Sequence, residues 1–497
     1  MIETETDGAG HGMKTGMKPA YRMGLAVFTL LTLASLFNIR KFPNMAETQW
    51  QLVTFLVLAI ILYLIPASLV SAELATGWPQ TGGVYVWVKK AFGQRWGFVA
   101  VWLQWFQMTI GFVAALTFIA ATFAYAFMPS VADNKLYQFI VSIIIWWGMT
   151  LVNLRGLKTY TSISWSFLVI GMLIPASLLI AGGVQYILSG NPIQLTLHPS
   201  WADIIPDFSN ISSIVFLLTF VFLFIGIEMT AAHAGEVSNV RKNYPIAILI
   251  VGVVMALVSI AGSLIVGFLV PTANLNLLTG IMQAFEVILA GSSWLVSIVA
   301  LLIVIGSIGE ASTWILGPVR GLASTAGDGN LPPLLQKTNA AGMPVNLMIL
   351  QAVLFTFWVG VYAILPGGVN SSYWVLLALT TVVYIVMYFF MYAAAIRLRY
   401  TQPGVRRPFM ILGGKAGMWL VAGWGFIAMV FLFFLSLIPP SQIEFTNLSV
   451  SSYVLFMILG VMAVVAVPLI IYQLRKPNWK PSGSDPTGSI AKSSSDQ

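Results

Sequence analysis

Apolar residues fill the chain in long stretches, and short polar segments separate these stretches from one another. A helix that crosses a lipid bilayer needs about 20 mostly apolar residues, and most of the stretches are near or above that length. The pattern predicts an all-α membrane protein with twelve transmembrane helices and no second folded domain between them. The predicted spans cover residues 23–42, 50–73, 96–127, 136–153, 162–187, 212–234, 245–270, 294–317, 345–365, 372–394, 417–438 and 452–473.

Composition agrees with this pattern and removes several classes of protein. Of 497 residues, 58% are hydrophobic and 8% are charged, whereas a soluble domain carries about 25% charged residues. A soluble protein of this size could not cover its surface with so few charges, and a disordered one would be far more polar. The chain has no cysteine and three histidines, so we expect no disulfide, no metal centre and no cofactor.

The net charge of +8 follows the predicted topology. When the termini and the even-numbered loops are assigned to the cytoplasm, all but three of the 24 Lys and Arg residues lie there. This distribution is the positive-inside rule, so both termini are expected in the cytoplasm. The charge is a topology signal and predicts no nucleic-acid partner. The three exceptions are Arg40, Lys41 and Lys135.

The two ends of the chain differ from the apolar region between them. Residues 1–22 predict a flexible cytoplasmic tail, because they are rich in glycine and polar residues and show no cleavage site of a signal peptide. Residues 475–497 predict a disordered cytoplasmic tail rich in Ser, Gly and Pro. Residues 23–474 form the predicted membrane domain, which is expected to lie in the lipid bilayer.

Two glutamates lie in the interior of predicted spans, Glu228 in the sixth and Glu310 in the eighth, and a third, Glu73, ends the second span. An ionisable residue at the bilayer centre costs about 2.5–3.5 kcal/mol on insertion scales and marks a candidate functional site. Gly226 precedes Glu228 by two residues and permits a break in the helix, which membrane proteins tolerate where the break lines a cavity. One interpretation is a packing glycine beside a structural glutamate. The other is a discontinuous helix with a carboxylate that takes up a proton.

The first span is also interrupted, by Ser35 and Asn38, and Pro43 is expected to close it. Serine and asparagine inside a span often bond only to a neighbouring helix. However, interruptions five spans apart are typical of inverted-repeat transporters, whose substrate binds between the broken helices. In that design, the N-terminal ends of half-helices face the substrate carboxylate.

Tyr384 and Tyr388 lie four residues apart in the tenth span and therefore on one helix face. They are interpreted either as an aromatic packing stripe or as two phenols that line a substrate path.

Several longer motifs resemble those of amino acid–polyamine–organocation permeases. ELATGWPQTGGVYVWVKKAFG begins at Glu73, GPVRGLASTAGDGNLPP follows the eighth span, and RRPFMILGG follows the tenth. GIEMTAAHAGEVSNVRKNYPIAI, GEASTWILGPVRG and LTTVVYIVMY are most similar to bacterial glutamate/GABA antiporters. The resemblance runs from about residue 23 to about residue 474.

The resemblance implies a LeuT-like fold, with spans one to five and six to ten as inverted repeats and two extra helices. It implies a secondary active amino acid/amine antiporter in the inner membrane of a bacterial cell, which works by alternating access, without ATP. It leaves a homodimer open. At the positions that match the family's functional residues, Glu228 and Glu310 would couple protons or gate, and Glu228 would lie near the substrate. Trp314 would pack over the aliphatic chain of a ligand or close its path, and Tyr384 and Tyr388 would line that path.

Arg40 departs from the glutamate exchangers, which can carry a tyrosine at this place. An arginine near the site could hold a substrate carboxylate in bidentate geometry. Alternatively, Arg40 pairs with a neighbouring acid or extends to the membrane interface. Including Arg40, the predicted substrate-binding set is Ser35, Asn38, Arg40, Gly226, Glu228, Trp314, Tyr384 and Tyr388.

The chief functional alternative is a proton-coupled amino acid uptake permease, with Glu228 or Glu310 as the proton carrier. An enzyme is not expected, since the chain contains no HExxH, GxSxG or P-loop motif. A channel is not expected either, because the outer loops show no repeated filter sequence or ring of charges.

Overall fold

A computed structural model describes residues 23–80, 82–155, 169–230, 237–290, 292–365, 368–439 and 449–480. The described residues form helices joined by turns, and no strand occurs among them. The tail predicted at 1–22 lies outside these residues, as does the tail predicted at 475–497 from residue 481 onward. Within the described part, the predicted all-α class is confirmed.

Ten helical segments of the described residues are long and apolar enough to cross a membrane. A bent pair, Leu25–Leu36 with Ile39–Ala46, brings the number to eleven when it is counted as one span. A shorter apolar helix at Leu217–Thr230 coincides with the predicted sixth span. The chain is therefore a multi-pass membrane protein.

The first half contains α1 (Leu25–Leu36), α2 (Phe42–Ala46), α3 (Leu52–Ala59), α4 (Ile65–Gly77), α5 (Val84–Phe92), α6 (Gln94–Phe127), α7 (Lys135–Asn153), α9 (Ile174–Leu188), α10 (Trp201–Ile204), α11 (Ile211–Ile214) and α12 (Leu217–Phe224).

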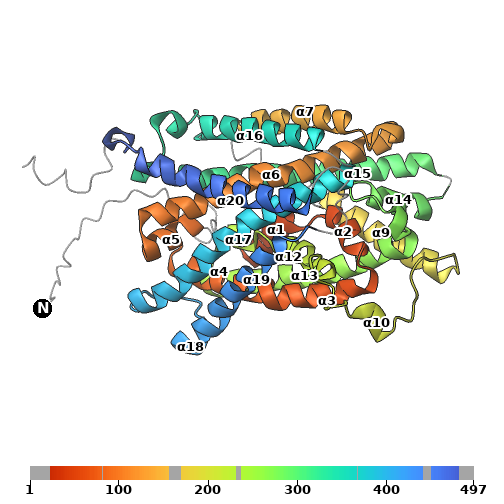
Figure 1. Cartoon of the computed structure of the whole chain (residues 1–497), viewed down its shortest axis with the longest axis horizontal. Coiled ribbons are helices and arrows are strands. Elements are labelled where there is room, and N and C mark those ends of the chain that lie inside the picture. The colour runs from red at the N-terminus through yellow and green to blue at the C-terminus, as the bar shows by residue number, and fades with distance from the viewer. Residues whose placement is uncertain are drawn as a thin grey trace, which may run out of the picture.

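Two long helices form the centre of the bundle (Figure 1). In the apolar windows of α6 and α17, 78% and 83% of the residues are buried by protein, against 17% in α20. α6 packs along both α15 and α17, while α7 and α16 lie side by side at the periphery. The second half contains α13 (Val240–Leu269), α14 (Gly280–Ile288), α15 (Ser293–Ala323), α16 (Val345–Ile364), α17 (Val369–Thr401), α18 (Gly414–Met418), α19 (Trp424–Ser436) and α20 (Val450–Gln473).

Helices α5 and α14 lie in connections for which hydropathy predicted no span, and each has nine residues. Both are too short to cross a bilayer. Their apolar residues face the bundle: Trp87 of α5 and Ala284 of α14 are fully buried. The connections are therefore folded parts of the membrane domain.

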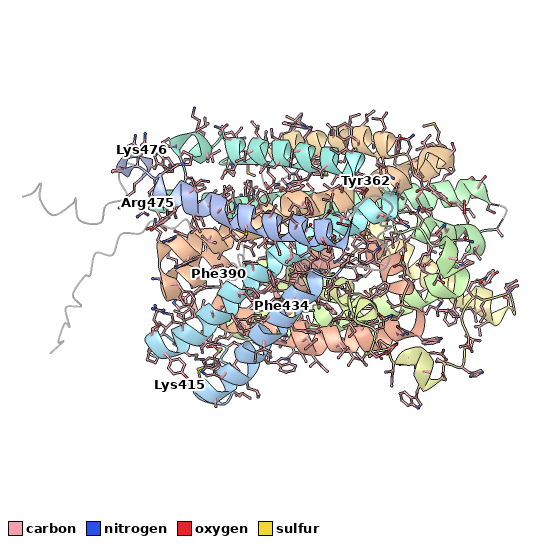
Figure 2. All side chains as sticks on the ribbon, in the orientation of Figure 1. Tyr362, Phe390, Lys415, Phe434, Arg475 and Lys476 are labelled. Carbon is pink, nitrogen blue, oxygen red and sulfur yellow. The ribbon has the colours of Figure 1, made fainter. Side chains whose placement is uncertain are left out.

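Basic residues gather at one end of the bundle. Lys415, Arg475 and Lys476 lie at the left end of the view in Figure 2. All three belong to the set that the sequence assigned to the cytoplasm, so their grouping is consistent with that assignment.

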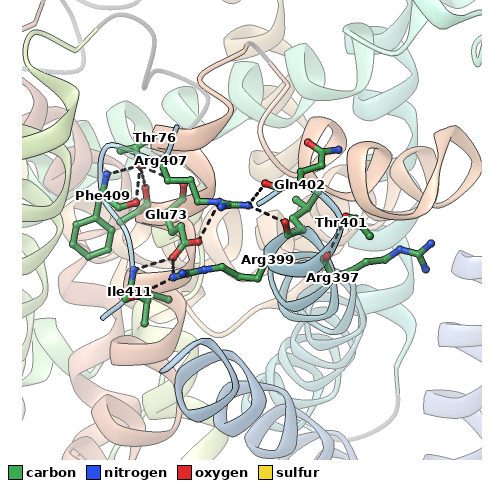
Figure 3. A network of polar contacts seen from close by, with 11 residues as sticks. Glu73, Thr76, Arg397, Arg399, Thr401, Gln402, Arg407, Phe409 and Ile411 are labelled. Carbon is green, nitrogen blue, oxygen red and sulfur yellow. Dashed lines mark hydrogen bonds and ion pairs between the residues drawn. The ribbon is translucent and has the colours of Figure 1, made fainter. Parts of the chain in front are cut away.

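A buried ion-pair cluster joins the end of α4 to the segment after α17 (Figure 3). Glu73 accepts hydrogen bonds from Arg399 Nη2 at 2.6 Å and from the Ile411 backbone N–H at 2.9 Å. Arg407 Nε lies 3.4 Å from the other oxygen of the same carboxylate, and its Nη2 donates to the Leu398 carbonyl at 2.8 Å. Because Glu73 has all these partners within the protein, we assign it a structural role.

Candidate functional site

The first span breaks at Phe37 and Asn38. α1 ends at Leu36, and the backbone of Asn38 is extended, with φ −148° and ψ 127°. The Asn38 side chain accepts a hydrogen bond from the Arg40 backbone N–H at 2.7 Å, which caps the 3₁₀ turn Ile39–Lys41. Pro43 was expected to close the span, and this prediction is wrong. It lies in the first turn of α2, where its fixed φ suits a helix start.

The sixth span breaks at Ile225 and Gly226. α12 ends at Phe224, and Gly226 has a φ of 99°, a conformation that residues with a Cβ rarely adopt. The Trp314 ring of α15 also covers this glycine, because an added Cβ would lie 2.2 Å from it. The discontinuous helix predicted from Gly226 is therefore present, and the glycine has two physical reasons to be there.

Trp314 connects the two breaks. Its indole Nε1 donates to the backbone carbonyl of Ser35 at the end of α1, while its ring packs on Gly226. The Ser35 hydroxyl bonds to the Leu31 carbonyl of its own helix at 2.7 Å. The ends of α1 and α12 are thus held next to each other by one side chain of α15.

A narrow cavity lies beside the two breaks. Four predicted site residues line it: Ser35, Arg40, Glu310 and Trp314. The other lining residues are Leu36, Lys41, Gln107, Met108, Gly111, Phe112, Ala115, Phe222, Ile225, Ala311 and Thr380. The cavity therefore brings together two cations from the turn Ile39–Lys41 with one carboxylate and an indole from α15.

Glu310 is the one carboxylate among the cavity-lining residues, and it is 9% exposed. The Asn38 amide donates to its Oε2. Arg40 and Lys41 are near enough to interact electrostatically with it. Asn38, which was predicted to contact substrate, therefore fixes Glu310 and the turn that carries Arg40.

Arg40 faces inward. It is 7% exposed, and its Nη1 is buried with no hydrogen-bond partner among the described residues. A buried guanidinium donor without a partner costs free energy unless a ligand or water satisfies it. The inward position of Arg40 disfavours the alternative in which its side chain extends to the membrane interface. Pairing with a nearby acid and binding of a ligand carboxylate both stay open.

Glu228 lies outside that cavity, in a closed cluster beneath the second break. It is 1% exposed and accepts hydrogen bonds from the Tyr384 and Tyr388 hydroxyls and from Gln104 Nε2, the last at 3.1 Å. Tyr63 donates in turn to the Tyr388 hydroxyl. Donors on two helices, α6 and α17, thus bind this carboxylate, and Tyr63 of the second span bonds to one of them. None of these groups is charged.

The site residues predicted from sequence therefore form two adjacent groups. Ser35, Arg40, Glu310 and Trp314 line the cavity, and Asn38 bonds to Glu310 beside it. Glu228, Tyr384 and Tyr388 bind one another. Gly226 joins the groups, since its N–H is 3.4 Å from the Tyr388 hydroxyl and its Cα faces Trp314. No cluster of three His, Asp or Glu side chains suited to a metal ion occurs in the described ranges.

Several residues of the two groups were not predicted. Gln104 and Gln107 are polar residues within the long apolar run of the third span, which was a signal that could have found them. Lys41 was noted only as one of the three basic residues outside the predicted cytoplasmic set. Tyr63 and Thr380 gave no signal, because isolated tyrosines and threonines are common in apolar helices.

The bundle, its two broken spans and the charged cavity between them define a membrane carrier of small molecules. The chain belongs to the amino acid permease family, whose sequence pattern matches residues 24–483. This assignment confirms the resemblance to the amino acid–polyamine–organocation superfamily and supports transport as the activity of the chain.

Named relatives agree with the family. A glutamate/gamma-aminobutyrate antiporter of Lactococcus lactis subsp. lactis is 32% identical over 91% of this chain and 90% of its own length. An uncharacterized transporter of Legionella pneumophila is 35% identical over 89% of this chain and 95% of its own. A probable agmatine/putrescine antiporter of Lactococcus lactis is 27% identical over 72% and 75% of the two chains. These relatives are named transporters or antiporters, not enzymes.

Proposed function

We propose that the protein is a secondary active antiporter that exchanges an amino acid for a related amino acid or amine, of the glutamate/GABA type. The observation that carries the proposal is the cavity beside the two breaks, which presents Arg40 and Glu310 to the same space. A zwitterionic or acidic amino acid matches this pair, with its carboxylate at Arg40 and its amino group at Glu310. The named glutamate/gamma-aminobutyrate relatives support the same class.

The proposed architecture has twelve transmembrane helices, with spans one to five and six to ten as inverted LeuT-like repeats and two extra helices. The breaks in the first and sixth spans, five spans apart, support this arrangement. We further propose that both termini face the cytoplasm of a bacterial cell, since the basic residues labelled in Figure 2 share one end of the bundle.

In the proposed mechanism, the ligand lies between the two breaks while one group of helices rocks against the others. The α1 and α12 ends move together because Trp314 contacts both. Glu228, Tyr384 and Tyr388 support the break at Gly226 from behind, and this cluster is the proposed site of proton coupling or gating. Arg40 and Glu310 orient the ligand.

Counterflow in proteoliposomes tests exchange directly. Vesicles loaded with unlabelled glutamate, and matched vesicles loaded with buffer, receive labelled glutamate outside under the same pH on both sides. The proposal predicts rapid accumulation of label only in the glutamate-loaded vesicles. GABA inside should substitute for glutamate if the exchange is of the amino acid/amine type.

Proton-coupled uptake is the second candidate, and the buried Glu228 favours it. A carboxylate that is 1% exposed among neutral donors is suited to bind and release a proton during transport. Buffer-loaded vesicles with an acidic exterior distinguish the two. Net uptake driven by the pH gradient alone would replace the antiport proposal with this one.

A further inference from the structure

Lys41 occupies the space between the two broken helices. Its Nζ lies 3.1 Å from the Leu223 carbonyl of α12. It also lies 3.5 Å from the Phe222 carbonyl and 3.5 Å from the Leu36 carbonyl, the last residue of α1. The Lys41 side chain is thus bonded to the carboxyl ends of both half-helices and not to solvent, and the residue is 9% exposed.

Those carbonyls form a site for a cation. The last carbonyls of a helix have no partner within the helix, and they carry the negative end of the helix dipole. In transporters with discontinuous helices, such half-helix ends coordinate the coupling ion. The Phe222 ring adds a further attraction, since the Lys41 ammonium lies 5.4 Å from its centroid.

We propose that Lys41 is a tethered ammonium that fills this cation site, in place of a dissolved ion or a ligand amino group. The side chain starts at the 3₁₀ turn Ile39–Lys41, and the break in the first span gives it access to both helix ends. A sodium ion is therefore not needed at this position. A ligand amino group must therefore bind elsewhere, and we assign it to Glu310, the one acid among the residues that line the cavity.

The tethered cation also sets the charge of the ligand, a conclusion that rests on the proposed function. Arg40, Lys41 and Glu310 together give the cavity one net positive charge when each is ionised. A ligand with one net negative charge, such as an acidic amino acid or a simple dicarboxylate monoanion, neutralises it. A dicationic amine does not.

Small-cation rescue tests the ammonium site without any transport assay. Purified Lys41→Ala is heated in detergent with methylammonium chloride, sodium chloride or choline chloride at equal ionic strength. We expect the unfolding temperature of Lys41→Ala to be lower than that of the wild type by several degrees, and methylammonium to recover most of the loss. Choline, which is too bulky for the gap between the helix ends, serves as the salt control.

Two further proteins make the result decisive. The wild type and Lys242→Ala, which removes an exposed lysine at the start of α13, should show no difference between the three salts. A recovery by sodium instead of methylammonium still supports a cation site. Equal response of Lys41→Ala to all three salts would overturn the proposal.

Lys41→Met covers the case in which the alanine variant does not fold, because methionine keeps most of the length of the side chain, up to the position of Cε, without its charge. In proteoliposomes, we expect the rate of glutamate exchange by Lys41→Met to fall by on the order of tenfold or more, because the variant lacks a charged hydrogen-bond donor. Exchange equal to that of the wild type would also overturn the proposal.

The two proposals fail differently. If the wild type exchanges no amino acid but methylammonium specifically stabilises Lys41→Ala, the proposed function is wrong and the cation site stands. If the wild type exchanges glutamate and Lys41→Met does so equally well, the function stands and the cation site is wrong.

Discussion

The two glutamates near the helix breaks, Glu228 and Glu310, are similarly buried but have different neighbours. Neutral donors surround Glu228: two tyrosine hydroxyls and a glutamine amide. Glu310 lies beside Arg40 and Lys41 and lines a cavity. A carboxylate in a closed neutral cluster can bind or release a proton without a ligand. A carboxylate that neutralises two cations can give up one of these ionic contacts to a charged ligand.

This difference assigns the two carboxylates different proposed roles. Glu310 and Arg40 hold the ligand, and Glu228 supports the break at Gly226 and responds to protons. Variants that remove one charge or one hydroxyl at a time test this division.

Glu310→Gln should have the largest effect. It leaves Arg40 and Lys41 buried without their acid, and breaking a buried pair from one side costs about 3–5 kcal/mol. We expect the exchange rate in proteoliposomes to fall by roughly 100-fold or more. The double variant Glu310→Gln with Arg40→Gln should recover stability but not exchange. Normal exchange by the single variant would remove Glu310 from the site.

Arg40→Ala should rank second and should depend on the ligand. A hydrogen bond to a charged group contributes about 1.5–3 kcal/mol, so inhibition by acidic amino acids should weaken by about 10- to 100-fold. Neutral and basic amino acids should lose less. Competition against labelled substrate measures the series, and Arg475→Ala, an exposed arginine, is the control. Equal losses across all three charge classes would reject the carboxylate role.

Glu228→Gln should change the dependence of exchange on pH more than its maximum rate. The amide still accepts a hydrogen bond from a tyrosine, so we expect the rate at the best pH to fall by no more than about tenfold. The amide does not bind or release a proton in this pH range, so the dependence of the exchange rate on pH between acidic and neutral conditions should flatten. Rates measured in steps across that range give the answer, and an unchanged profile would exclude Glu228 as the proton-responsive group.

Tyr388→Phe should have the smallest effect of the four. It removes the hydroxyl that donates to Glu228 Oε2, a loss of about 1 kcal/mol, or roughly fivefold in substrate affinity. Tyr392→Phe on the same helix is the matched control, because the Tyr392 hydroxyl is buried without a hydrogen-bond partner among the described residues. Affinities that change equally in the two variants would show that the Glu228 contact is not responsible.

The sequence predicted the all-helical, multi-pass bundle and its two breaks because their causes are local. Long apolar stretches set the helices, Gly226 permits a φ that other residues avoid, and Asn38 can cap a turn through its own side chain. The shared face of Tyr384 and Tyr388 follows from helical periodicity alone.

The partners of the charged residues could not be predicted in the same way. Whether Arg40 faces the cavity or the membrane interface depends on how α1 turns after its break, and the contact of Lys41 with two carbonyls of α12 joins segments about 180 residues apart. Such contacts are set by the packing of distant helices. Pro43 illustrates the limit. A proline was expected to end the first span, but Pro43 lies in the first turn of α2 and helps to start that helix.

Equilibrium binding to two purified variants tests the division of roles most directly. Labelled glutamate is titrated onto the wild type, Glu228→Gln and Glu310→Gln in detergent, with unfolding temperatures as the check on folding. The division predicts that Glu228→Gln binds within about tenfold of the wild type and that Glu310→Gln binds far more weakly. Strong binding by Glu310→Gln together with lost binding by Glu228→Gln would contradict it.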